Sequence, residues 1–311
     1  RGPLYISGVA LESLSALKNL RYVSAGLYLY GNGNANVTDL AGLESLQSVG
    51  SLYVASLPSL TSLEALRNTS FQHLLGTDIG RALPEAVSGE VELLGLPKLE
   101  SLSGLDSVTG LQNLTINDCD ALTDLSGLSA LRDVGGMRLE GNAGLLSLNG
   151  VPQLRAAYSI ELVSDPNLVD ISALSVLEDV KYLWVYNLLY LTDFLPLRNV
   201  RVGSVTILNM PSLQSLDGLE GLGENANVIN VQNNAVLEDI TALSGVRTAW
   251  QIEIRDNARL RSLAGLDGLE SVTVGSEIFR NALVPQCAVD ALHERIPLLE
   301  GTLNDTTATC M

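Results

Sequence analysis

Residues 114–134 read LTINDCDALTDLSGLSALRDV, and versions of this unit recur from the first residues of the chain to about residue 275. Each copy begins with two apolar residues separated by one other residue, here Leu114 and Ile116. From Val91 onward, successive copies begin 23, 23, 23, 23, 22, 24 and 23 residues apart. A fixed period of this length is typical of a solenoid, in which each repeat forms one turn.

The apolar pairs predict one short strand per turn, because their alternation has the period of a strand. Stacked turns then place these strands in one parallel sheet. The pairs are Leu4/Ile6, Leu27/Leu29, Leu52/Val54, Val91/Leu93, Leu114/Ile116, Met137/Leu139, Ile160/Leu162, Leu183/Val185, Val205/Ile207, Ile229/Val231 and Ile252/Ile254. The rest of each unit has a leucine at every third position, as at Leu213, Leu216 and Leu219. That period predicts short 3-10 corners that direct the leucines into one core.

Two further columns of the repeat predict how each turn is held. The residue before the second of these leucines is Ser or Asp in all eleven copies: Ser13, Asp39, Ser62, Ser101, Asp124, Ser147, Asp170, Asp193, Ser215, Asp239 and Ser262. Such side chains accept hydrogen bonds from backbone N–H groups one or two residues on, so we expect them to cap turns rather than to catalyse. A small residue or proline follows three positions later, as at Gly127, and predicts a tight corner.

A column of asparagines lies five residues after the start of each pair. It holds Asn32, Asn142, Asn234 and Asn257, with Cys119 and Asp165 among the exceptions. Asparagine can bond to backbone groups of adjacent turns, so we expect a ladder of hydrogen bonds. We expect Cys119 to replace one rung as a small buried residue.

The rhythm breaks at two places. Leu52 and Val91 are 39 residues apart, which suggests an irregular shortened turn at 67–90 with a strand at 71–75. After Val274 the repeat fades, and apolar residues at helical spacing from Val284 to Ile296 predict a short helix. We therefore expect a mainly β solenoid of about 12 turns over residues 1–275 and a C-terminal cap over 276–311, as one continuous domain.

Composition narrows the classes of partner. The net charge is −17, which argues against nucleic acid and anionic lipid as partners, because both are recognised by clustered Lys and Arg. No apolar run reaches the roughly 18 residues that span a bilayer, so direct membrane insertion is not expected. The chain starts at Arg1 without a signal-peptide pattern, and we interpret it as a mature or trimmed fragment. Cys287 and Cys310 both lie within the predicted cap, and a disulfide between them would indicate an oxidising compartment.

A search for catalytic motifs finds none that is specific. The two histidines, His73 and His293, lie far apart in the sequence, and no second ligand or nucleophile is in view for His73. Sequences typical of zinc proteases, paired-cysteine metal sites, nucleophile elbows, phosphate loops and EF-hands are absent. The sequence therefore predicts no enzyme activity, no metal and no cofactor.

The residue between each apolar pair should point outward from the sheet, and here the sequence is informative. Tyr182, Trp184 and Tyr186 occupy three outward positions of one strand, with Arg138 and Glu161 on neighbouring turns. A second group consists of Tyr28 and Tyr53 in one column, with Tyr30 beside it. Aromatic residues with a polar tip dominate binding hot spots, so both groups are candidate ligand sites. The alternative is that these aromatics only stabilise neighbouring strands.

The repeat resembles the leucine-rich solenoids of the receptor L-domain type. These form ligand-binding lobes of insulin- and EGF-receptor-like proteins and have relatives on bacterial and fungal cell surfaces. The likeness rests on the apolar pairs, the asparagine column and the spaced leucines, and covers nearly the whole chain. It implies a right-handed β-helix in a secreted or cell-surface protein, extracellular or periplasmic, that binds or adheres to a protein or a glycan. A structural component of an envelope or matrix that associates with copies of itself is the alternative.

Overall fold

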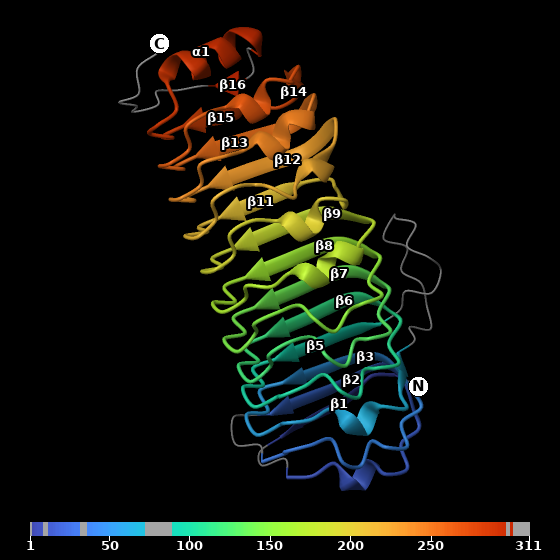
Figure 1. Ribbon diagram of the computed structural model, residues 1–311. Coiled ribbons are helices and arrows are strands. Elements are labelled where there is room, and N and C mark those ends of the chain that lie inside the picture. Colours follow the sequence, from blue (N-terminus) through green and yellow to red (C-terminus); the bar gives the residue numbers. More distant parts are fainter. Residues whose placement is uncertain (1, 9–11, 32–35, 72–88, 297–298, 301–311) are drawn as a thin grey trace. The chain divides into compact units, whose positions relative to one another are not determined.

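The computed structural model describes residues 2–8, 12–31, 36–71, 89–296 and 299–300. The fold is mainly β, a parallel β-solenoid of about 11 turns with short 3-10 segments and one C-terminal helix among these residues (Figure 1). This confirms the predicted fold class. By compactness the chain divides into an N-terminal unit (Arg1–Glu161 and Asp165–Val176) and a C-terminal unit (Leu162–Ser164 and Leu177–Met311).

The N-terminal unit contains parallel strands that pair in the register of the repeat, for example Leu4 with Leu27 and Leu114 with Met137. Its strands are β1 (Leu4–Gly8), β2 (Tyr22–Gly31), β3 (Ser48–Ala55), β4 (Ser70–Phe71), β5 (Glu90–Leu94), β6 (Gly110–Asn117), β7 (Asp133–Glu140) and β8 (Ala156–Val163), of which the last two residues are counted in the other unit. The 3-10 segments are η1 (Ser15–Leu17), η2 (Glu64–Leu66) and η3 (Ser172–Val176).

The C-terminal unit repeats this arrangement and also contains the helix. Its strands are β9 (Asp179–Tyr186), β10 (Arg201–Val202), β11 (Val205–Leu208), β12 (Asn225–Gln232), β13 (Thr248–Arg255), β14 (Ser271–Val272), β15 (Ser276–Phe279) and β16 (Leu299–Glu300). The 3-10 segments are η4 (Leu195–Leu197), η5 (Glu220–Leu222), η6 (Thr241–Gly245) and η7 (Ala264–Leu266), and the helix is α1 (Gln286–Arg295). Helix α1 lies where it was predicted, whereas β15 pairs with β13 and carries the parallel pairing past residue 275.

The region around residues 67–90 differs from the expectation. Strand β3 pairs with both β4 (Val49 with Phe71) and β5 (Leu52 with Val91), so the described residues form one strand position here rather than an additional turn. This accounts for about 11 turns in place of the expected 12. Only Phe71 of the predicted strand at 71–75 is described. Residues 72–88, with His73, lie outside the described residues, as do Asn32 and Cys310.

The predicted turn caps are present in all eleven copies of the Ser/Asp column. In each, the side-chain oxygen accepts a hydrogen bond from the backbone N–H two residues on; Asp124 accepts from Ser126 at 2.8 Å and Asp239 from Thr241 at 2.6 Å. The corner prediction is also confirmed at Gly127, which has a φ of +108° and would bring a Cβ within 2.2 Å of the Leu102 carbonyl carbon. Only glycine avoids that contact and tolerates that φ.

The asparagine ladder is clearest in the C-terminal unit. Asn257 Oδ1 accepts bonds from the backbone N and Nδ2 of Asn234, each at 3.1 Å, and its own Nδ2 donates to the Val231 carbonyl at 3.0 Å. Asn281 repeats this pattern towards Asn257 and the Ile254 carbonyl. All three asparagines are fully buried. The ladder therefore satisfies backbone groups that the core would otherwise leave unpaired.

Candidate binding surface

The tyrosine column of the N-terminal unit is assembled by strand register. Tyr5, Tyr28 and Tyr53 lie side by side because β1, β2 and β3 pair in parallel at these positions. The ring centroids are 4.5 Å apart for Tyr5 and Tyr28 and 4.8 Å apart for Tyr28 and Tyr53, with nearly parallel planes. Tyr30 stacks beside Tyr28 at 6.3 Å. The structure thus brings Tyr28, Tyr53 and Tyr30 together as predicted, in an arrangement that also stabilises the strands.

This column is anchored at one end by an acidic side chain. The Tyr53 hydroxyl donates a hydrogen bond to a carboxylate oxygen of Glu92, the outward residue of β5. The pKa of Tyr53 is raised, mainly by burial and next by the hydrogen bond to Glu92. The pKa of Tyr28 is also raised, mainly by burial and next by the nearby Tyr5 and Tyr30. Both phenols therefore stay neutral and can donate hydrogen bonds at any physiological pH.

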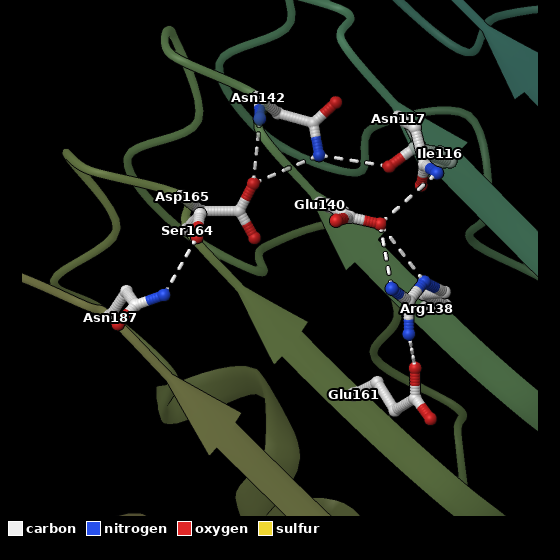
Figure 2. Close-up of polar contacts among 9 residues, drawn as sticks. All are labelled: Ile116, Asn117, Arg138, Glu140, Asn142, Glu161, Ser164, Asp165 and Asn187. Atoms are coloured by element: carbon white, nitrogen blue, oxygen red, sulfur yellow. Dashed lines mark hydrogen bonds and ion pairs between the residues drawn. The ribbon is translucent and has the colours of Figure 1, made fainter. Parts of the chain in front are cut away.

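A charged cluster forms on the same face of the N-terminal unit. Arg138 makes an ion pair with Glu161 and a second one, at 2.7 Å, with Glu140 (Figure 2). Asn117 Nδ2 adds a hydrogen bond to Glu140 at 3.4 Å. The pairing of Arg138 and Glu161 follows from the 23-residue spacing, whereas Glu140 was missed. Its outward position, two residues after Arg138 on β7, was the available signal.

In the C-terminal unit, β9 carries the second predicted group. The rings of Tyr182 and Trp184 are stacked with centroids 5.4 Å apart and planes 10° apart. Trp184 lies beside Thr206, and Tyr186 lies beside Leu208, through the pairing of β9 with β11. All three aromatic residues of β9 are half-buried. Tyr182, Trp184 and Tyr186 together are called the β9 aromatic surface, and on the β11 side Trp184 and Tyr186 lie next to Thr206 and Leu208.

Asp165 occupies the asparagine column of the N-terminal unit and is fully buried. Its Oδ1 accepts hydrogen bonds from the backbone N and Nδ2 of Asn142, at 2.8 and 3.0 Å (Figure 2). Among the described residues, buried Oδ2 has no hydrogen-bond partner. Burial raises the pKa of Asp165 to about 6, the bonds from Asn142 oppose this, and the charge of Glu140 raises it further. A buried unpaired oxygen is rare and calls for a specific explanation.

Cys119 behaves as predicted for a buried rung. It is fully buried, it is a free thiol, and its backbone N–H donates to Asn142 Oδ1 at 3.0 Å. Burial raises the pKa of its thiol to about 12, so the thiolate needed for metal binding or redox chemistry is not populated near neutrality. Cys287 lies in the first turn of α1, and its disulfide with Cys310 stays a prediction.

The described residues contain no group of three or more His, Cys, Asp and Glu side chains placed to hold a metal ion. No helix in the same ranges is long and apolar enough to cross a membrane. In comparisons with known proteins, no family model matches the chain, and no curated protein matches it.

Proposed function

We propose that this chain is a non-enzymatic binding module of a secreted or cell-surface protein, which recognises a protein or a glycan through the outward face of its sheet. The stacked pair Tyr182 and Trp184 on β9 carries this proposal. Aromatic side chains supply large contact areas at a low cost in conformational entropy, and they dominate binding hot spots. A strand also holds them more rigidly than a loop would.

The two tyrosine and tryptophan groups do not support the proposal equally. In the N-terminal unit the rings stack from strand to strand, which by itself gives them a role in stability. In the C-terminal unit Tyr182 and Trp184 stack along one strand, while Trp184 faces Thr206 across the strand pair. Cross-strand stacking therefore does not account for Trp184, which makes β9 the better candidate for recognition.

The remaining polar side chains of the repeat support a binding rather than a catalytic role. Five aspartates of the Ser/Asp column are engaged as turn caps. Arg138 pairs with both Glu140 and Glu161 on the outward face, where such a cluster would add polar contacts to a ligand. The proposed location at a cell surface rests on the L-domain resemblance and on the predicted disulfide.

The proposal is tested by capture of ligand on the intact chain. A glycan array and a pull-down from the surface of the producing cells supply the ligand, and capture is then compared for Trp184→Ala, Tyr182→Ala and Trp250→Ala. Trp250 is the matched control, because it is the other tryptophan, 46% exposed, near the start of β13. We expect capture to weaken about tenfold or more for the β9 variants alone. Equal capture by Trp184→Ala and the parent protein would exclude β9.

Self-association, the alternative function, has its own readout. Light scattering over a wide range of concentration gives the mass of the particle in solution. A mass that rises with concentration would favour the structural role, and a constant monomer mass would favour the binding module.

A further inference from the structure

A groove of about 820 Å³ lies in the C-terminal unit, and its lining residues lie outside the strands of the sheet. Its walls come from segments that follow strands β9, β11, β12 and β13, and they include Tyr190, Gln214, Glu238 and Arg259. The volume lies within the range of ligand-binding pockets, roughly 300–1,000 Å³. None of the residues of the β9 aromatic surface lines it, so the groove is a separate candidate site.

Tyr190 provides an aromatic platform at this groove. Tyr190 is 54% exposed. Within the described ranges, no hydrogen bond or ring contact engages it. An exposed ring that contributes little to packing is suited to stack against a flat ligand face, with its hydroxyl group available as donor or acceptor.

The polar residues of the groove fall into two sets. The serines are used internally: Ser212 Oγ donates to the Leu189 carbonyl at 2.7 Å, and Ser215 Oγ accepts from Asp217 N at 3.3 Å. By contrast, no hydrogen bond in the described part of the chain engages the side chains of Gln214 and Asp217. The serines thus fix the shape of the groove and leave an amide and a carboxylate for a ligand.

Glu238 and Arg259 add a loosely held ion pair to the lining. Their charged atoms are 3.9 Å apart, and Glu238 lies 3.7 Å from Arg261. These distances exceed those of direct hydrogen bonds, so both groups retain hydrogen-bonding capacity. Planar amide, carboxylate and guanidinium groups can each contact two neighbouring hydroxyls at once.

We propose that this groove binds a neutral oligosaccharide, with one sugar ring on Tyr190 and hydroxyl groups bonded by Gln214, Asp217 and Arg259. The lining has one cation, Arg259, against two anions, Asp217 and Glu238, which disfavours an acidic sugar. Its few apolar residues disfavour an apolar ligand. The walls advance over three strand spacings, about 14 Å in all at ~4.8 Å each, which suits a short chain of sugars rather than a single ring.

The test uses the intact protein and a panel of defined oligosaccharides. Neutral gluco-, manno-, galacto- and N-acetylglucosamine oligomers and an acidic galacturonate oligomer are titrated by calorimetry and by saturation-transfer NMR. We expect a neutral member to bind, Tyr190→Ala to weaken it about tenfold or more, and Tyr190→Phe to weaken it about threefold or less, because the ring alone supplies stacking. Gln214→Ala should weaken it severalfold. Thermal melting checks that each variant is folded.

Trp184→Ala separates this inference from the proposed function. The groove predicts unchanged saccharide affinity for Trp184→Ala. Saccharide binding that is lost with Trp184→Ala and kept with Tyr190→Ala would place the ligand on the sheet face and overturn the inference. No binding by any neutral oligomer, or binding of the acidic oligomer alone, would overturn it as well, while leaving protein capture by β9 a separate question.

Discussion

The same column of the repeat is built differently in the two units. In the C-terminal unit Asn234, Asn257 and Asn281 form rungs in which each amide both accepts and donates. In the N-terminal unit the rung after Asn142 is Asp165, whose Oδ1 accepts from Asn142 while its Oδ2 lacks a partner among the described residues. An amide always offers a donor at this place, whereas a carboxyl group does so only when protonated.

The spacing of the ladder identifies the group that Asp165 should face. Asn142 donates to the carbonyl 26 residues earlier, at Ile116, and Asn257 does the same towards Val231. The equivalent acceptor for Asp165 is the carbonyl of Leu139. Two oxygen acceptors at this place would repel each other unless one carried a proton, so the spacing of the ladder favours protonation of Asp165. Burial also raises the pKa of Asp165, which favours the protonated form as well.

Breaking a complete rung should have the largest effect on stability. Asn257→Ala removes the acceptor of two bonds from Asn234 and the donor to Val231, all within the core. Because each buried polar group left unpaired costs ~1–3 kcal/mol, we expect a loss of about 3–5 kcal/mol in the free energy of unfolding. Urea denaturation measures it, with the exposed Asn199→Ala as control. A loss below about 1 kcal/mol would mean that the ladder is not a major source of stability.

The incomplete rung should make stability depend on pH. The pKa of Asp165 in the folded state, about 6, lies above the ordinary value of 3.8. Protonated Asp165 therefore contributes fully to the free energy of unfolding below about pH 4, and this contribution is lost as the pH rises through about 6. The difference of about two pKa units corresponds to about 3 kcal/mol. The capping residue Asp170 has a lowered pKa, chiefly because of its hydrogen bonds from Ser172, and acts in the opposite direction. The effect of Asp165 must therefore be measured against a variant.

That variant is Asp165→Asn, which would complete the rung. We expect little change at pH 4 and a stabilisation of about 1–3 kcal/mol at pH 8, because the amide can donate where the carboxylate cannot. Asp133→Asn, with the same change of charge at a half-buried position of the same unit, is the matched control. Denaturant unfolding of both variants and the parent protein at pH 4 and pH 8 measures the differences in the free energy of unfolding. Equal stability of Asp165→Asn and the parent protein at pH 8 would contradict the raised pKa of Asp165, because the buried carboxylate would then carry no cost.

A turn cap should matter less than either rung. Asp124 accepts a single bond from the Ser126 N–H at the edge of the fold, so Asp124→Ala should cost about 1 kcal/mol. Asp124→Ser should cost little, because serine performs the same role at six other positions of this column. Thermal melting of the pair provides the measurement. A serine variant as unstable as the alanine variant would indicate that the carboxylate has another role.

These comparisons show which features of the molecule a sequence can predict. The caps and the ladder were predictable because each depends on one residue type at a fixed position in a regular repeat. Asn281 was missed because the apolar pattern fades before it, although the ladder continues. The spacing of 39 residues between Leu52 and Val91 was ambiguous, since counting cannot tell a shortened turn from an insertion in one turn.

Features that depend on side-chain packing were harder to predict. Arg138 and Glu161 were expected as neighbours, but the share of Glu140 in their cluster depends on the rotamers of long side chains. The sequence shows Asp165 as an exception in the asparagine column, but only the folded structure shows that its Oδ2 is buried without a hydrogen-bond partner among the described residues. The groove beside Tyr190 left no pattern in the sequence, because four segments of different composition form it.

On the proposed function, the inward columns of each turn maintain the fold, whereas the outward column recognises a ligand. Ligand capture and melting temperature, measured together for Trp184→Ala and Asn257→Ala, test this division. We predict that Trp184→Ala weakens capture about tenfold or more and shifts melting by about 2 °C or less, whereas Asn257→Ala lowers melting by several degrees and retains affinity while folded. Full capture by Trp184→Ala, or a fall in its melting temperature as large as that of Asn257→Ala, would contradict this division.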